Sequence, residues 1–212
     1  EPTSSDNVFM DGNSGAVTVT VTTSTRPCNN LTFTGFTGTF AGTGFGVNIS
    51  GNLVMGAGMT NSLGTGLNFV ATSGTKTITC NGIQMRAITI NCSGATVQLV
   101  DQFDFIATTF TLTAGTFDPN GQTVLFSGSA IPFVDGNWNF FNWSITGTGS
   151  ASLLFTTSTA QTITVTGTLT INIPSARCYF SKSSFFLGTA TTINSATNAI
   201  QRLDCRDITG AG

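Results

Sequence analysis

Two carboxylates and two indole rings are the side chains of this sequence whose types could form a binding site for a sugar. Asp101 and Asp104 lie three residues apart, and Trp138 and Trp143 bracket the most aromatic segment of the chain. Two carboxylates that face each other across a glycosidic bond can hydrolyse it. Indole rings add a flat apolar face with a polar edge. These four residues are therefore the candidate carbohydrate contacts.

Other features of the sequence argue against catalysis. The chain has no His, which removes Ser-His-Asp and Cys-His arrangements together with the usual general base. An offset of three places Asp101 and Asp104 on opposite faces of a regular strand, and Asp118 and Asp135 precede Pro or Gly as ordinary turn residues. An alternative is a calcium site of Asp101 and Asp104 with Arg86 as a base. We predict no catalytic residue, no cofactor and no metal site, and hence a protein that is not an enzyme.

Composition limits the classes of partner. Only 8% of the 212 residues are charged, but 40% are hydrophobic and 18 are Phe, so the chain can bury a core and fold. The net charge is −2 and the seven Lys and Arg are spread along the chain, which argues against nucleic acid. No run of 18 apolar residues occurs, so we expect no membrane insertion.

The elements that must position these side chains are strands. Apolar and polar residues alternate through most of the chain, and Gly, Asn and Ser interrupt the alternation. About a dozen short strands are predicted, with inward apolar residues two apart. Examples are Val17, Val19 and Val21; Leu31 and Phe33; Ile88 and Ile90; Val97 and Leu99; Val124 and Phe126; and Ile163, Val165, Leu169, Ile171 and Ile173.

Two all-β architectures fit this pattern. An antiparallel β-sandwich needs a hairpin turn after most strands, and four Asn-Gly or Asp-Gly pairs are too few for that. A parallel β-helix (β-solenoid) needs tight corners and coils of roughly 20 to 30 residues. Residues 51–55, 114–117 and 166–171 each place Gly before a strand and suggest such a repeat. We predict one β-helix domain over residues 1–212, in which residues 1–15 lead into the first coil.

The phases of Cys and aromatic residues predict what fills the core. Cys80, Cys92, Cys178 and Cys205 each lie two residues from an apolar neighbour, so they are interpreted as small inward hydrophobes. The alternative is that two of them form a disulfide. Aromatic residues are expected to stack inside the coil, with an exposed contact patch around Trp138 and Trp143 as the alternative. The Phe pairs concerned are Phe103 and Phe105, Phe140 and Phe141, and Phe185 and Phe186.

Three segments carry a resemblance to a known family. Residues 2–9, 28–35 and 110–124 resemble repetitive pectin-lyase-like β-helix proteins of bacteriophage virions and bacterial surfaces. The resemblance implies a right-handed parallel β-helix. It also implies a role as a tail spike, a fibre, a capsid-attached protein or an adhesin. Residues 203–209 are similar to a penultimate coil of such proteins, so we expect the natural chain to continue beyond Gly212.

Three functional hypotheses follow. The first is a non-catalytic structural protein of a phage virion or an extracellular filament, which self-assembles as a trimer or an end-to-end fibre and displays an adhesive surface. It places the protein outside the cell or on the virion. The second is a tailspike that binds or depolymerises a cell-surface glycan. The third is a bacterial surface adhesin or an ice-binding solenoid. The ice-binding hypothesis is based on four Thr-x-Thr pairs: Thr18 and Thr20, Thr75 and Thr77, Thr111 and Thr113, and Thr162 and Thr164.

Overall fold

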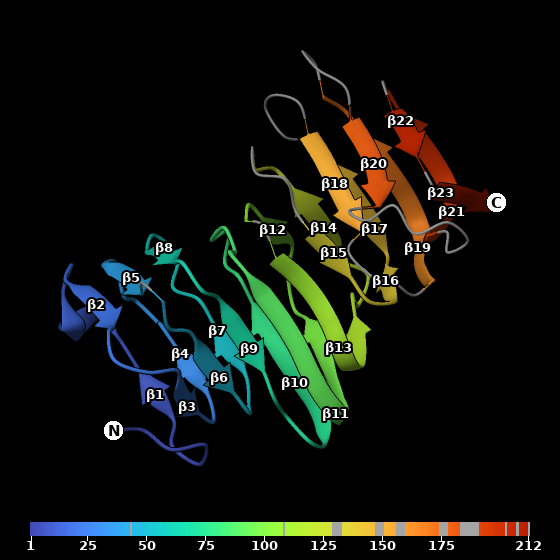
Figure 1. Cartoon of the computed structure of the whole chain (residues 1–212). Coiled ribbons are helices and arrows are strands. Elements are labelled where there is room, and N and C mark those ends of the chain that lie inside the picture. The colour runs from blue at the N-terminus through green and yellow to red at the C-terminus, as the bar shows by residue number, and fades with distance from the viewer. Residues whose placement is uncertain are drawn as a thin grey trace.

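The protein is an all-β parallel solenoid of about eight turns. Figure 1, drawn from a computed structural model, shows the coils stacked along one axis with the two termini at opposite ends. The structure describes residues 1–42, 44–107, 109–128, 133–146, 151–155, 160–173, 178–182, 191–201, 203–206 and 208–211. A single 3-10 turn, Gly12–Ser14, is the one helical element within these residues.

Three sheets form the walls of the solenoid. The largest consists of β1 (Val8–Phe9), β3 (Arg26–Cys28), β4 (Leu31–Thr32), β6 (Val47–Ile49), β7 (Leu53–Val54), β9 (Leu67–Phe69), β10 (Gly74–Thr79), β11 (Ile88–Leu99), β13 (Thr109–Asp118), β15 (Phe133–Asp135), β18 (Ala151–Phe155), β20 (Cys178–Lys182) and β22 (Leu203–Arg206). The second consists of β12 (Phe103–Phe105), β14 (Thr123–Phe126), β16 (Trp138–Phe140), β17 (Asn142–Ile145), β19 (Gln161–Ile171), β21 (Thr191–Ile200) and β23 (Ile208–Ala211). The third has only β2 (Thr18–Val21), β5 (Thr39–Gly42) and β8 (Thr60–Leu63).

The register confirms a parallel coil. Leu31 pairs with Leu53, Leu53 with Ile78, and Ile78 with Leu99, which gives steps of 22, 25 and 21 residues. All four side chains are at most 2% exposed and form one column inside the solenoid. The ladders between the named strands are parallel, so the antiparallel sandwich is wrong. The right-handed sense of winding stays a prediction.

One hydrophobic core runs from Val21 to Ile193. Ile163, Val165, Leu169 and Ile171 are all buried along β19, although the strand changes register between Val165 and Thr168. Gly167 lies at this shift and has no room for a side chain, because an added Cβ would lie 2.4 Å from Asn142 Oδ1 in the preceding coil. The inward phase predicted across Gly167 is therefore confirmed.

Two predicted core residues are exposed instead. Val17 is 52% exposed because it precedes β2, in the first coil, where no described coil covers it from the outer end of the stack. Phe141 is 40% exposed and lies at the bend between β16 and β17, directly after the inward Phe140. Phe185 and Phe186 lie outside the described residues.

The cysteine prediction is confirmed for three residues and wrong for one. Cys80, Cys92 and Cys178 are buried, as is Cys28, and all five thiols are free, so the disulfide alternative is not supported. Cys205 is exposed. It lies on β22, the last strand of its sheet, so no further strand of that sheet covers it.

A ladder of asparagine side chains joins successive coils along one corner. The Asn7 Oδ1 atom accepts a hydrogen bond from Asn30 Nδ2 at 2.8 Å, Asn30 Oδ1 accepts one from the Asn52 backbone N–H at 2.7 Å, and Asn52 Oδ1 accepts one from Thr77 N–H at 2.9 Å. Gly51 lies directly against this ladder, because an added Cβ would be 2.4 Å from Asn30 Oδ1. The Gly-before-strand pattern of the sequence thus marks corners where coils touch.

Replacement of Gly51 by alanine should therefore lower the free energy of unfolding by about 1–3 kcal/mol, because the new methyl group has to displace the ladder. Gly64→Ala is the matched control, since the nearest atom to its added Cβ is Gly42 O at 3.2 Å. Urea unfolding followed by circular dichroism measures both. Equal losses in the two variants would contradict a close contact at Gly51.

Candidate functional site

The candidate site lies where one wall of the solenoid lacks a strand. The three-stranded sheet ends at β8 and the seven-stranded sheet begins at β12. Residues 81–87 pass between them as a loop that makes only a single bridge, Met85 to Phe105. The loop begins at Asn81 and Gly82, both of which have positive φ, so the chain turns sharply where a strand would otherwise start.

Side chains replace the missing strand on the β8 side. The Arg86 Nε atom donates to the Asn61 carbonyl oxygen at 3.0 Å, and Asn61 Nδ2 donates to the Gln84 carbonyl oxygen at 3.2 Å. The Asn61 Oδ1 atom accepts the Leu63 N–H at 3.3 Å. Asn61 is only 8% exposed, and these bonds satisfy backbone groups that an adjacent strand would otherwise pair.

The β12 side of the gap is closed by the loop backbone. The Met85 N–H donates to the Asp104 carbonyl oxygen at 2.6 Å, and the Ile106 N–H donates to the Met85 carbonyl oxygen at 3.0 Å. Four backbone groups along the two strand edges are therefore already bonded: Asn61 O, Leu63 N–H, Asp104 O and Ile106 N–H. The gap is a side-chain groove and does not offer an open edge for a further strand.

The groove has a volume of about 450 Å³. Its polar lining comes from Thr60, Asn61, Gln84, Arg86 and Asp104, and its apolar lining from Met59, Ile83 and Ile106. The Asp104 carboxylate accepts hydrogen bonds from Gln84 Nε2 at 3.1 Å and from the Ser127 hydroxyl. A cation, a carboxylate and amides thus line one concave surface.

Asp101 has a different task from Asp104. Its two carboxylate oxygens accept the N–H groups of Cys80 and Asn81, at 2.7 and 2.6 Å, in the preceding coil. It thereby holds the turn that starts the groove loop. The two carboxylates share no hydrogen-bond partner among the described residues. Each one accepts a hydrogen bond from the preceding coil.

Trp138 and Trp143 are both 0% exposed and lie in the core. Neither ring presents a face to a ligand, so the structure does not support them as carbohydrate contacts. The first interpretation, that the aromatic segment fills the core, describes their placement. Only Asp104 of the four candidate contacts lines the groove.

The remaining candidates for chemistry are dispersed. The Asp118 carboxylate accepts Gln98 Nε2 at 2.6 Å and the Asn120 N–H at 2.8 Å, as expected for a turn residue. Burial raises the pKa of the Asp135 carboxyl. Within the described residues, no three His, Cys, Asp or Glu side chains gather as metal ligands would.

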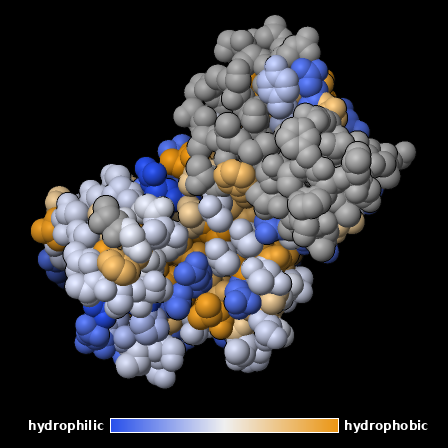
Figure 2. Space-filling model, in the orientation of Figure 1, coloured by the Kyte–Doolittle hydropathy of each residue, from blue (hydrophilic) through white to orange (hydrophobic). Residues whose placement is uncertain are grey.

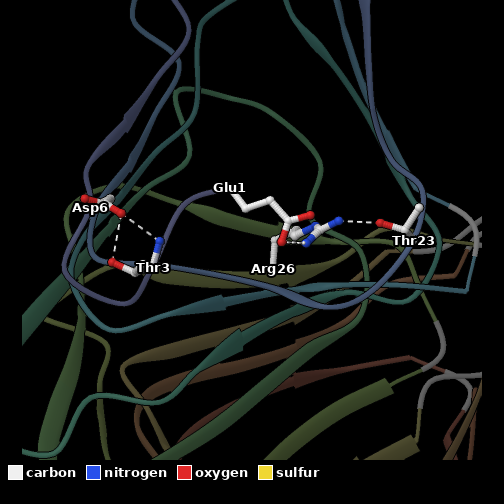
Figure 3. A network of polar contacts seen from close by, with 5 residues as sticks. All are labelled: Glu1, Thr3, Asp6, Thr23 and Arg26. Carbon is white, nitrogen blue, oxygen red and sulfur yellow. Dashed lines mark hydrogen bonds and ion pairs between the residues drawn. The ribbon is translucent and has the colours of Figure 1, made fainter.

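A second hollow, of about 270 Å³, opens at the first coil between β1, β2 and β3. Its lining is mostly apolar and includes Val8, Val19, Val21 and Leu31. Figure 3 shows polar contacts of this end of the chain: the Arg26 guanidinium pairs with Glu1 at 2.7 Å and bonds Thr23, and Asp6 accepts two bonds from Thr3. The Glu1–Arg26 ion pair fastens the start of the chain to the first coil, while the Thr3–Asp6 bonds hold a turn within residues 1–6.

The groove depends on residues that the sequence alone does not bring together. Asn61, Gln84 and Arg86 come from adjacent coils, and only Arg86 stands out in the sequence, as a base in the calcium alternative. The available signal is the loss of apolar alternation after Asn81-Gly82.

No family model, curated protein or solved structure matches this chain. The resemblance to β-helix proteins is confirmed only as far as the fold, which is a parallel β-solenoid. None of the described helical segments has the length and apolar character needed to cross a bilayer.

Proposed function

We propose that this solenoid is a non-catalytic structural protein of a phage virion or of an extracellular filament, which acts by self-association and by displaying its surface. The observation that supports the proposal is that carboxylates form hydrogen bonds between coils. Asp101, Asp104 and Asp118 each accept hydrogen bonds from the preceding or following coil. Carboxylates held this way support a stiff rod, and none of these three shares a hydrogen-bond partner with another of them.

The outer surface carries repeated polar residues, which suits a protein that makes many weak contacts with other molecules. Outward positions form columns of like residues, such as Thr18, Thr39 and Thr60, and Thr75, Thr96 and Thr116. Figure 2 shows a face of mostly intermediate hydropathy, with strongly hydrophilic and hydrophobic residues scattered over it. The Thr-x-Thr pairs do not extend into arrays of paired columns, because Thr20 is followed by Ala41 and Ser62, and Thr77 by Gln98 and Asp118. Ice binding is therefore not part of this proposal.

Apolar groups at the first coil favour contact between subunits. Phe9 is 67% exposed and Val17 is 52% exposed, and the apolar hollow lined by Val8, Val19 and Val21 opens in the same coil. Burial of such side chains against a second subunit is favourable by roughly 25 cal/mol per Å² of apolar area. A coil end also presents backbone groups that another coil can pair, and head-to-tail pairing builds filaments.

Sedimentation velocity over a hundredfold range of protein concentration tests this proposal. The wild type should form trimers or longer assemblies, and a Phe9→Ser, Val17→Ser variant should shift toward monomer by about tenfold or more in dissociation constant. Phe141→Ser is the matched control, because Phe141 is 40% exposed but lies in the middle of the solenoid. A wild type that stays strictly monomeric at the highest concentration would overturn the proposal.

A further inference from the structure

The Arg86 guanidinium is only partly used by the fold. Its Nε atom bonds the Asn61 carbonyl, while no other hydrogen bond or ion pair joins it to a residue that the structure describes. Arg86 is half-buried and lines the groove. A guanidinium has five N–H donors in a planar fork, and a partly buried cation gains from an anionic partner.

The Asp104 carboxylate lies in the same groove and accepts only two hydrogen bonds, although a carboxylate offers about four acceptor sites. It is not within ion-pair distance of Arg86, so neither charge neutralises the other directly. The exposed Thr60 hydroxyl and Gln84 amide add donors and acceptors at the rim. The groove therefore offers fixed acceptors and donors together with one cationic point.

The apolar part of the lining restricts the ligand further. Met59, Ile83 and Ile106 contribute hydrocarbon surface between the polar groups. A ligand that fits must combine C–H surface, several hydroxyl groups that both donate and accept, and an anionic group. An extended peptide fits poorly, because on each of the β8 and β12 edges two of the backbone groups that it would pair are already bonded. Nucleic acid does not fit a groove with a single cation on a chain of net charge −2.

We propose that this groove binds a saccharide unit that carries an anionic group, with that group on Arg86 and ring hydroxyls donating to Asp104. The volume of about 450 Å³ lies in the range of small-ligand sites. A bidentate contact of Arg86 with a carboxylate, sulfate or phosphate is a strong, charge-assisted hydrogen bond. This inference does not depend on self-association of the solenoid.

The first test compares ligands on one sugar ring. D-glucose, D-glucuronate, D-glucose 6-sulfate, D-glucose 6-phosphate and inorganic phosphate are titrated separately into the full chain, with backbone amide shifts in NMR spectra as the readout. At least one charged sugar should bind about tenfold or more tightly than D-glucose, and the tightest one identifies the anionic group. Equal affinity for D-glucose, equal affinity for phosphate alone, or binding of none of the five would overturn the proposal.

The second test uses variants. Arg86→Gln removes the charge but keeps an amide donor for the Asn61 carbonyl, and Asp104→Asn keeps the acceptor for Ser127. Each should weaken the charged sugar about tenfold or more. Asp118→Asn is the control, because Asp118 is held by Gln98 as Asp104 is held by Gln84 but lies outside the groove. If Arg86→Gln does not fold, Asp104→Asn and Gln84→Ala decide the question. Unchanged affinity in the folded groove variants would exclude this site.

Discussion

Replacement of Trp138 by alanine is expected to lower the free energy of unfolding by about 3–5 kcal/mol. The indole ring is 0% exposed and stacks on Phe110 with ring centroids 4.1 Å apart. Its centroid also lies 5.2 Å from that of Phe117 and 5.8 Å from that of Phe140. Truncation removes contacts with two rings on β13 and with one ring on the same strand, β16, and a rigid stack of coils can close the resulting cavity only in part.

Urea unfolding followed by circular dichroism measures this loss. Tyr179→Ala is the comparison for an exposed aromatic residue, since Tyr179 is 41% exposed, and it should cost less than about 1 kcal/mol. A loss for Trp138→Ala as small as that for Tyr179→Ala would contradict the core placement. It would also restore an indole ring to the candidate carbohydrate contacts.

A pair of conservative substitutions separates packing from hydrogen bonding. The Trp138 Nε1 atom donates to the Asp135 carbonyl oxygen at 2.9 Å, whereas the Trp143 Nε1 atom is buried and has no hydrogen-bond partner among the described residues. Trp138→Phe loses a bond, while Trp143→Phe removes a buried donor that is already unsatisfied. Trp138→Phe should therefore cost about 1 kcal/mol more than Trp143→Phe. A larger loss for Trp143→Phe than for Trp138→Phe would contradict this assignment of hydrogen bonds to the two indole N–H groups.

Alternation of apolar and polar residues was sufficient to predict the strands and most of the core. Residues two apart share a face of any strand, so Ile88 and Ile90, or Val97 and Leu99, are buried wherever their coil lies. The parallel arrangement followed from the small number of hairpin signals. Exposure near the ends of the stack was not predictable in the same way. Val17 and Cys205 have the inward phase, but each has a described neighbouring coil on one side only.

The groove could not be predicted because it depends on the register between coils. Asn61 and Arg86 are 25 residues apart and Gln84 and Asp104 are 20 apart, while paired positions elsewhere differ by as little as 17 residues, as for Thr191 and Ile208. Without a constant coil length, no spacing in the sequence tells which side chains lie above one another. Asp104 lies on β12 but Asp101 precedes it, so strand phase does not describe how they are separated, and their partners in the preceding coil were not foreseeable.

The free energy of unfolding is expected to fall steeply as the pH rises above about 9, because the core contains thiols that resist ionisation. Burial raises the pKa of Cys28 from its ordinary value of 9.0 to about 11, and burial with a smaller effect of Cys205 raises that of Cys178 to about 12. Burial also raises the pKa of Cys80, and the nearby Asp101 and Asp104 carboxylates raise it further. In the unfolded chain these thiols ionise near pH 9, while in the folded chain they remain neutral.

The sign follows from proton binding. Below pH 9 both states hold these protons, so the contribution of the thiols to stability is fully present. Between pH 9 and about 11 to 12 the folded state holds more protons than the unfolded state, and stability is lost as the pH rises. Each thiol contributes a slope of up to about 1.4 kcal/mol per pH unit. Three thiols together would remove about 4 kcal/mol per unit, a large part of the stability of a domain.

Urea unfolding at intervals from pH 8 to pH 10.5 measures this slope, with a reducing agent present throughout. Cys80→Ala should reduce the slope by about 1.4 kcal/mol per pH unit, whatever its effect on stability at neutral pH. Cys205→Ala is the control. Cys205 is exposed, so folding raises the pKa of its thiol less than it raises that of the buried Cys80. If Cys80→Ala and the wild type lose stability at the same rate, the Cys80 thiol is not enclosed by the coils. The inward placement of Cys80, two residues after Ile78, would then be wrong.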